Sequence, residues 1–184
     1  MSPKLDEYLK KKFPKIYGEP EKESCFTMFG FECNDGWFRI LLWLSEYVQR
    51  YIDSENDWAA KYPDQAKPVE QVKALQVKEK FGTLRFYYSG GDDKIQSVVS
   101  FVEFMSGKVC ERTGSFEDIG RNTKGWIKTQ HVSLSHNGKD FNYVEDEELR
   151  NLLSEHRFTN EPQDRKSTRL NSSHSQQSRM PSSA

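Results

Sequence analysis

The strongest constraint on the fold is a helical repeat in residues 37–51. Its apolar side chains recur at intervals of three and four residues, which predicts an amphipathic helix. The residues on this face are Trp37, Ile40, Leu41, Leu44, Val48 and Tyr51. Phe38, Leu42 and Trp43 widen the apolar stripe, so we expect neighbouring elements to cover this helix on more than one side. Residues 53–68 are mostly polar and contain two prolines, which predicts a loop.

Three other segments combine an N-terminal capping residue with an apolar stripe, which predicts three further helices. They cover residues 2–13, 92–106 and 146–157, and either Asp92 or Asp93 caps the second of them. Its stripe is rich in β-branched residues, which are weak helix formers, so packing against other elements must stabilise this helix.

A first β-hairpin is predicted around Gly82, because apolar and polar residues alternate on both sides of it. A two-residue turn at Phe81-Gly82 would pair Val77 with Phe86 and Leu75 with Tyr88. Phenylalanine disfavours the positive φ that such a turn requires. A longer, bulged loop with a shift of one residue is therefore the alternative.

A second β-hairpin is predicted around Asn137-Gly138, because both residues tolerate the positive φ of a tight turn. With this turn, Leu134 pairs with Phe141 and Val132 pairs with Tyr143. Both pairs would lie on one face of the hairpin.

The resulting order is helix, helix, hairpin, helix, hairpin, helix. It lacks the alternation of strands and helices that is typical of parallel sheets, so the predicted fold class is α+β. We expect two antiparallel β-hairpins, which could form one small sheet, packed against about four helices. Residues 15–34 are expected to be irregular or short extended chain, and residues 1–163 to form a single compact domain.

The last 21 residues, 164–184, differ in composition from the rest of the chain. Back-translated codon by codon, Asp164–His174 resembles a common short-read sequencing-library adapter, and Met180–Ala184 resembles the far end of that adapter. We therefore expect residues 164–184 to be a disordered, non-native tail, with the natural chain continuing differently after Gln163. The tail carries four basic residues and one acidic residue, so its removal changes the net charge from −1 to −4.

The composition argues against a membrane protein, a secreted protein and a general polyanion binder. The longest apolar run, Ile40–Leu44, is far shorter than the roughly 20 residues that span a bilayer. The charged N-terminus does not resemble a secretory signal. Three cysteines at irregular spacing fit free thiols in a reducing cytoplasm. The mildly acidic body exerts no general attraction on phosphate backbones.

No motif for catalysis or for metal binding stands out. Cys25, Cys33 and Cys110 lack the close pairing of tetrahedral zinc sites, although Cys33 and Cys110 could converge with His131 and His136. Buried or partly buried free thiols are the simpler interpretation. We expect no enzyme activity, no cofactor and no metal. An enzyme would require His131, Cys110 or the Asp92-Asp93 pair to meet in a pocket.

Three segments resemble a family of uncharacterised phage and prophage proteins. They are Gly30–Trp37 (GFECNDGW), Gln76–Tyr88 (QVKEKFGTLRFYY) and Met105–Glu111 (MSGKVCE). The resemblance covers roughly residues 24–130, and its second segment is the most specific. It implies a phage or prophage source, and hence the cytoplasm of a bacterial host cell, without implying an activity.

Some members of that family carry a Cys-x-x-Cys-Gly motif and a later cysteine pair, as in a small zinc ribbon. This chain keeps Cys110, Gly114, Gly125 and Trp126, but Thr113 stands in place of the second cysteine. A single thiolate cannot hold a structural zinc ion. The resemblance therefore implies a ribbon-like segment that has lost its metal.

Arg85 and Tyr87 lie on the face of the first hairpin opposite Phe86. On an open face they could stack on nucleic-acid bases or contact a partner protein, whereas on a covered face they would be structural. We expect a non-catalytic phage or prophage accessory protein that acts by binding, and the sequence leaves open whether its partner is a host protein, a phage protein or, less favoured, nucleic acid. The alternative is a small nucleic-acid-binding module, derived from a zinc ribbon without its metal, that uses Arg85, Tyr87, Trp126 and Lys128.

Overall fold

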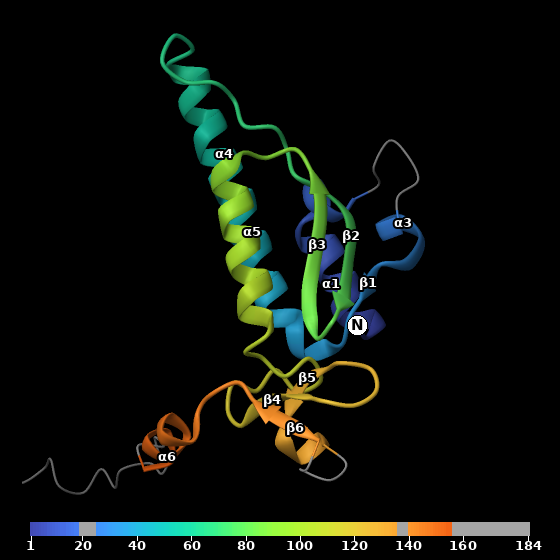
Figure 1. The fold of residues 1–184 in the computed structure, drawn as a ribbon. Coiled ribbons are helices and arrows are strands. Elements are labelled where there is room, and N and C mark those ends of the chain that lie inside the picture. The colour runs from blue at the N-terminus through green and yellow to red at the C-terminus, as the bar shows by residue number, and fades with distance from the viewer. Residues whose placement is uncertain (19–24, 136–139, 156–184) are drawn as a thin grey trace, which may run out of the picture.

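The computed structural model describes residues 1–18, 25–135 and 140–155, and these residues form two small sheets and the helices that accompany them (Figure 1). The predicted α+β class is confirmed. Four of the described helices have more than one or two turns: α1 (Pro3–Lys12), α4 (Phe38–Lys61), α5 (Asp93–Ser106) and α6 (Glu147–Glu155). None of the described helices is both long enough and apolar enough to span a bilayer. The predicted tail, residues 164–184, lies outside the described residues.

The first sheet has the strand order β1-β2-β3, with β1 (Phe31–Glu32), β2 (Lys73–Lys80) and β3 (Thr83–Ser89). β1 runs parallel to β2, and β2 and β3 form the predicted antiparallel hairpin. Its turn is the two-residue Phe81-Gly82, with φ of 54° and 74°, so the longer-loop alternative does not occur. Val77 pairs with Phe86 as predicted. The predicted pairing of Leu75 with Tyr88 is wrong, because a bulge between Ala74 and Gln76 places Ala74 opposite Tyr88.

Helix α4 is longer than its apolar repeat predicted, and it packs with the first sheet around the main core. The loop predicted for residues 53–68 is wrong for residues 53–61, which belong to α4. Ile52 and Ala59 continue the buried face of the helix through this otherwise polar stretch. The largest fully buried side chains include Leu9 of α1, Trp37 and Leu41.

The segment between α1 and α4 is more regular than predicted. It contains α2 (Pro14–Tyr17), α3 (Cys25–Phe29), β1 and the 3₁₀ turn η1 (Asp35–Trp37). These elements are too short to show a period in sequence. They are held by burial of Ile16, Tyr17 and Phe26, and by a hydrogen bond of 2.8 Å between the hydroxyls of Tyr17 and Ser45 of α4.

Helix α5 begins as predicted and seals the outer edge of β3. Asp92 is its N-cap, because Oδ1 accepts a hydrogen bond of 3.0 Å from the Ile95 N–H. Two β3 backbone donors point at α5: the Leu84 N–H donates to Ser106 Oγ and the Phe86 N–H donates to the Glu103 carboxylate, each at 2.8 Å. The edge of the sheet is thereby satisfied by side chains instead of another strand.

The second sheet differs from its prediction. Its order is β5-β4-β6, with β4 (Ile119–Asn122), β5 (Thr129–His131) and β6 (Phe141–Tyr143), all antiparallel. The predicted second hairpin is wrong, because Val132 and Leu134 lie in the 3₁₀ turn η2 (Val132–Leu134) and β6 pairs with β4. The predicted turn at Asn137-Gly138 lies outside the described residues.

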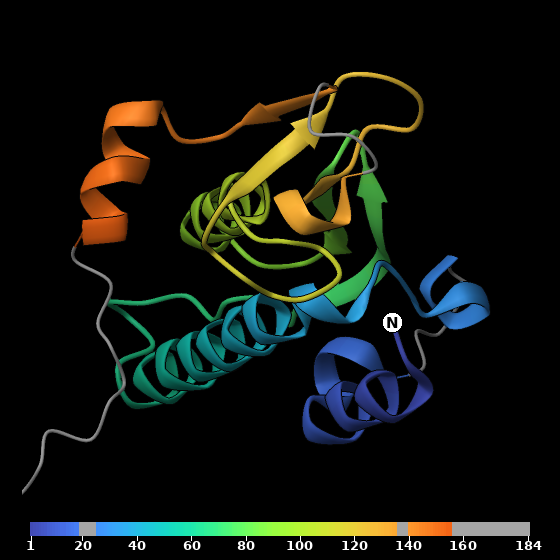
Figure 2. The same cartoon turned by 90° about the horizontal axis from the view of Figure 1, so that it is seen from below.

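Figure 2 shows the second sheet in front of the β2–β3 hairpin end, with α6 set to one side. The predicted start of α6 is confirmed, because Asp146 Oδ1 accepts a hydrogen bond of 2.8 Å from the Leu149 N–H. The predicted C-terminal residues of this helix, His156 and Arg157, lie outside the described residues.

Candidate functional site

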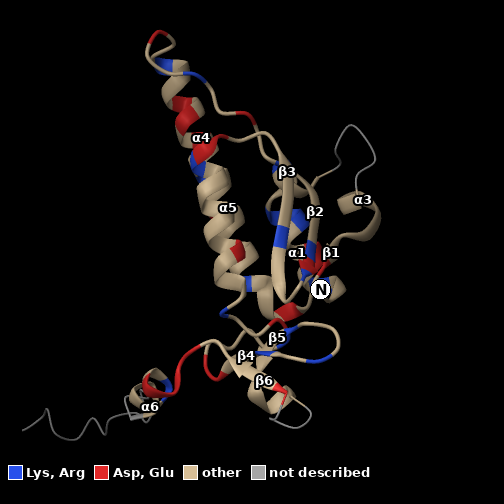
Figure 3. Cartoon of the chain, in the orientation of Figure 1, with Lys and Arg blue, Asp and Glu red and all other residues tan. Residues whose placement is uncertain are grey.

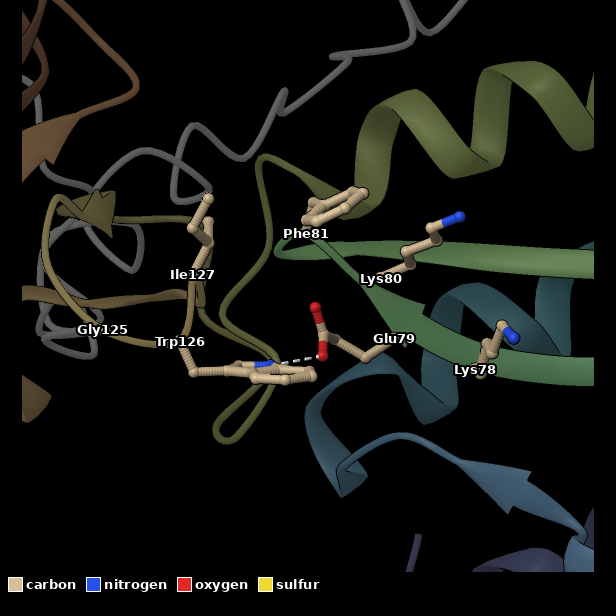
Figure 4. Close-up of a pocket in the computed structure, with 7 residues that line it drawn as sticks. All are labelled: Lys78, Glu79, Lys80, Phe81, Gly125, Trp126 and Ile127. Atoms are coloured by element: carbon tan, nitrogen blue, oxygen red, sulfur yellow. Dashed lines mark hydrogen bonds between the residues drawn. The ribbon is translucent and has the colours of Figure 1, made fainter.

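A pocket of about 500 Å³ lies where the hairpin of the first sheet meets the second sheet. We call it the tip pocket. Its walls are the β2–β3 turn and the loop of residues 123–128 that joins β4 to β5 (Figure 4). Its lining residues are Lys78, Glu79, Lys80, Phe81, Gly125, Trp126 and Ile127. This volume lies within the range of roughly 300–1,000 Å³ that is typical of small-molecule sites.

The turn wall is strained and firmly docked. Phe81 occupies the left-handed region with φ of 54°, which costs a bulky residue on the order of 1–3 kcal/mol. Gly82 approaches the second sheet so closely that an added Cβ would lie 3.1 Å from Thr129 Oγ1. The buried Thr129 hydroxyl donates a hydrogen bond of 2.5 Å to the Gly82 carbonyl. This docking fixes the turn on β5, and the Phe81 ring remains 65% exposed.

The loop wall is organised by the side chain of Asn122. Its Nδ2 donates to the carbonyls of Lys124 and Trp126, and its Oδ1 accepts from the Lys128 N–H, each at 2.6 Å. Gly125 adopts φ of 75° within this loop. The Asn122 side chain thus stabilises the loop through three hydrogen bonds to its backbone. These bonds also fix the backbone at Trp126, and hence the direction of its side chain.

Glu79 joins the two walls. One carboxylate oxygen accepts a hydrogen bond of 2.7 Å from the Gly82 N–H, and the other accepts one of 2.8 Å from the Trp126 indole N–H (Figure 4). The indole is therefore oriented, although 71% of Trp126 is exposed. An exposed aromatic side chain with a fixed orientation loses little conformational entropy when a ligand covers it.

The face of the first sheet beside the pocket carries two of the residues singled out from sequence. Arg85 pairs with Lys78 across the hairpin, and Tyr87 pairs with Gln76. Lys78 Nζ lies 5.5 Å from the centre of the Tyr87 ring. Tyr87 is 43% exposed and Arg85 is half-buried, so this face is open. Since Lys78 also lines the tip pocket, it links Trp126 to the Arg85–Tyr87 face.

Basic side chains around the pocket are free to meet an anion. Among the described residues, Lys78, Lys80, Arg85 and Lys128 form no ion pair, whereas Lys124 pairs with Asp140 at 2.8 Å. Figure 3 shows basic residues on β3 and on the loop beside β5, and acidic residues on the far half of α4 and before α6. Acidic charge is also present at the pocket itself, because Glu79 lines it and Glu111 lies near Lys128.

Lys128, the fourth residue singled out from sequence, is exposed and lies near the buried carboxyl of Glu111. Burial raises the pKa of Glu111, while hydrogen bonds from the Asn34 backbone and side-chain amides, at 3.0 and 2.9 Å, and the charge of Lys128 oppose that rise. Glu111 thus ties the segment before α4 to the second sheet.

The structure places Trp126 and Lys128 in the loop that faces the β2–β3 turn, and it places Arg85 and Tyr87 on β3, two and four residues after the first residue of that strand. Sequence reasoning missed Lys78, Lys80 and the pocket walls Phe81 and Ile127. One available signal was Phe81 itself, because a phenylalanine in a two-residue turn that requires positive φ conflicts with local preference, and such conflicts are typical of functional sites.

The groups considered for metal binding or catalysis have structural surroundings. Cys110 Sγ accepts a hydrogen bond of 3.4 Å from the Thr113 N–H, and His131 Nδ1 lies 2.7 Å from Ser133 Oγ. Burial raises the pKa of the Cys33 thiol to about 12. Within residues 1–18, 25–135 and 140–155, no three His, Cys, Asp or Glu side chains are arranged to hold a metal ion. The expectation that all three thiols are at least partly buried is wrong for Cys25, which is exposed.

No known protein family, curated protein or solved structure matches the chain, so the geometry of the tip pocket is the basis for assigning a function.

Proposed function

We propose that this chain is a non-catalytic accessory protein that acts by binding, and that the tip pocket is its binding site. The observation that carries the proposal is the indole of Trp126, which is largely exposed yet held in one orientation by Glu79. Exposure of a large aromatic ring is unfavourable in water, and fixed aromatic anchors are enriched where proteins bind their partners.

The pocket favours a ligand with a flat or apolar group next to negative charge. Phe81, Trp126 and Ile127 supply apolar walls, and Lys78 and Lys80 stand at their margin. Glu79 holds the pocket walls together, because its two oxygens accept hydrogen bonds from Gly82 and Trp126.

The remaining candidate groups support binding over catalysis. Asp92 caps α5, Cys110 is buried in the turn that follows α5, and His131 lies at the end of β5. These groups sit on separate elements and each already has a structural partner. The resemblance of three segments to phage and prophage proteins supports the cytoplasm of a bacterial host as the place of action.

Affinity capture tests this proposal. The full chain, the Trp126→Ala variant and the Trp43→Ala variant are immobilised and exposed to the same bacterial lysate. Trp43 is the matched control, because it is a tryptophan on α4 that is 51% exposed and lies outside the pocket. We expect the wild type and Trp43→Ala to retain the same component, and Trp126→Ala to lose it. Equal capture by all three proteins would refute the pocket as the binding site.

A further inference from the structure

We propose that the tip pocket and the open Arg85–Tyr87 face bind single-stranded nucleic acid. One unpaired base would stack on Trp126 in the pocket, and the phosphates would lie along Lys78, Lys80 and Arg85. This inference rests on the proposed function of the pocket and names the class of its ligand.

Aromatic and basic side chains alternate across this surface. Lys80 Nζ lies 5.5 Å from the Phe81 ring centre and Lys78 Nζ lies 5.5 Å from the Tyr87 ring centre. Proteins that bind single strands combine stacking rings for successive bases with cations that follow the backbone. The alternation therefore matches the repeat of a nucleotide, which carries one flat ring system and one negative charge.

The same alternation continues toward a second pocket of about 410 Å³, lined in part by Phe104, Lys108, Arg121 and Tyr143. Thr83 connects the two areas, because it lines the second pocket and accepts a hydrogen bond of 2.6 Å from Arg85 Nη1. Lys108 Nζ lies 5.9 Å from the Phe104 ring centre. A strand held in the tip pocket would thus meet further rings and cations in the direction of α5.

The lysines of this surface favour nucleic acid over a protein as the ligand. Protein–protein interfaces are enriched in aromatic residues and arginine but depleted in lysine. Lys78 and Lys80 line the pocket, and among the described residues neither forms an ion pair. Phosphates neutralise such lysines with the release of counterions. A duplex is disfavoured, because its paired and stacked bases cannot enter the pocket.

Binding to a labelled oligothymidylate of about 12 nucleotides, followed by fluorescence anisotropy at low salt with the full chain, tests the inference. We expect saturable binding that weakens with salt, with a slope of log K against log salt of about −2 for three neutralised phosphates. Trp126→Ala should weaken binding by about 5- to 150-fold through loss of stacking. Trp126→Phe, which keeps a ring but loses the bond to Glu79, should weaken it less. Lys78→Ala should make the salt slope shallower by about 1.

Trp43→Ala is the control variant and should bind like the wild type. The thermal midpoint of each variant shows whether it is folded, and since Trp126 is largely exposed we expect its variants to fold. No anisotropy change at low salt, or equal weakening by Trp126→Ala and Trp43→Ala, would overturn the inference. If nuclease-treated lysate still yields a protein whose capture requires Trp126, nucleic acid is the wrong ligand class while the pocket remains the binding site.

Discussion

The two sheets of this molecule are similar in size and differ in what holds them. The first sheet is backed by α4 and α5 and contributes Val77, Leu84 and Phe86 to a continuous buried core. In the second sheet, Ile119 and Phe141 are the buried apolar residues of the described strands, and neither belongs to that core. The second sheet is instead joined to the first by polar contacts.

Those polar contacts converge on a few residues. Between the hairpin and the second sheet with its loop, Thr129 donates to Gly82 and Glu79 accepts from Trp126. Beside them, the segment after α5 is held to the segment before α4, because Glu111 accepts from Asn34 and the buried Trp37 indole donates to the Val109 carbonyl at 3.1 Å. Hydrophobic burial supplies most of the stability of a domain, whereas each hydrogen bond contributes about 1 kcal/mol. The first sheet therefore supplies most of the global stability, and the second sheet presents the binding loop. Because polar contacts hold the second sheet in place, it can detach by local unfolding while the first sheet stays folded.

The largest loss of stability should come from replacing Trp37, which contributes both to the main core and to the polar contacts near the second sheet. Its ring is fully buried in the main core, and its N–H holds the segment that leads to the second sheet. We expect Trp37→Ala to lower the free energy of unfolding by about 3–5 kcal/mol. Denaturant unfolding measures this, and the exposed Trp43→Ala should stay within about 0.5 kcal/mol of the wild type. Equal losses in the two variants would contradict the position of Trp37 in the core.

A smaller and local effect is expected for Thr129→Val. The valine keeps the shape of the side chain but leaves the Gly82 carbonyl without its buried donor, a loss of about 1–3 kcal/mol. We expect faster amide hydrogen exchange in residues 119–131 and little change in β2. Thr129→Ser, which keeps the hydroxyl, should behave like the wild type. Uniformly faster exchange through both sheets would show that they unfold as one unit.

Replacing Phe81 separates stability from binding. Phe81→Asn creates the Asn-Gly turn that suits two positive φ values, so it should raise the free energy of unfolding by about 1 kcal/mol. The same variant removes a ring from the tip pocket and should weaken oligothymidylate binding. Parallel denaturant and anisotropy measurements test both effects. A less stable variant would mean that the Phe81 ring contributes to packing, contrary to its exposure.

The smallest effect should be a pH dependence centred on Glu111. Because burial raises its pKa in the folded protein, Glu111 contributes stability that is fully present below its unfolded pKa of about 4.5 and lost as pH rises through the folded value. Glu111→Gln removes this titration, so the stability of wild type relative to Glu111→Gln should fall as the pH is raised from below about 4.5 toward neutrality. Denaturant unfolding across that range is the measurement. A constant difference would mean that Glu111 does not titrate differently in the fold.

The sequence predicted well where a long period coincided with burial. The stripes of α4 and α5 and the alternation in the β2–β3 hairpin are of this kind. The second sheet was missed because β4 is four residues long and contains Gly120, and because its pairing partners lie 8 to 23 residues away in sequence. Such short strands form only after the rest of the chain has brought them together.

The same contrast applies to the candidate site, where local patterns were predictable and long-range contacts were not. Arg85 and Tyr87 could be placed on an open face because their hairpin has a clear period. The pocket itself depends on the contact between Gly82 and Thr129, which are 47 residues apart in sequence, and no local pattern encodes that contact. Trp126 could therefore be named from sequence, but its position beside Phe81 could not.

The hydrogen bonds from α5 to the edge of β3 affect how two copies of the chain could associate. With the Leu84 and Phe86 amides engaged by Ser106 and Glu103, an incoming strand could not use these two donors without displacing α5. The opposite margin is β1, which offers only two residues. β-Augmentation on the β3 side would therefore have to break the two hydrogen bonds to α5, which disfavours the pairing of two copies along that edge.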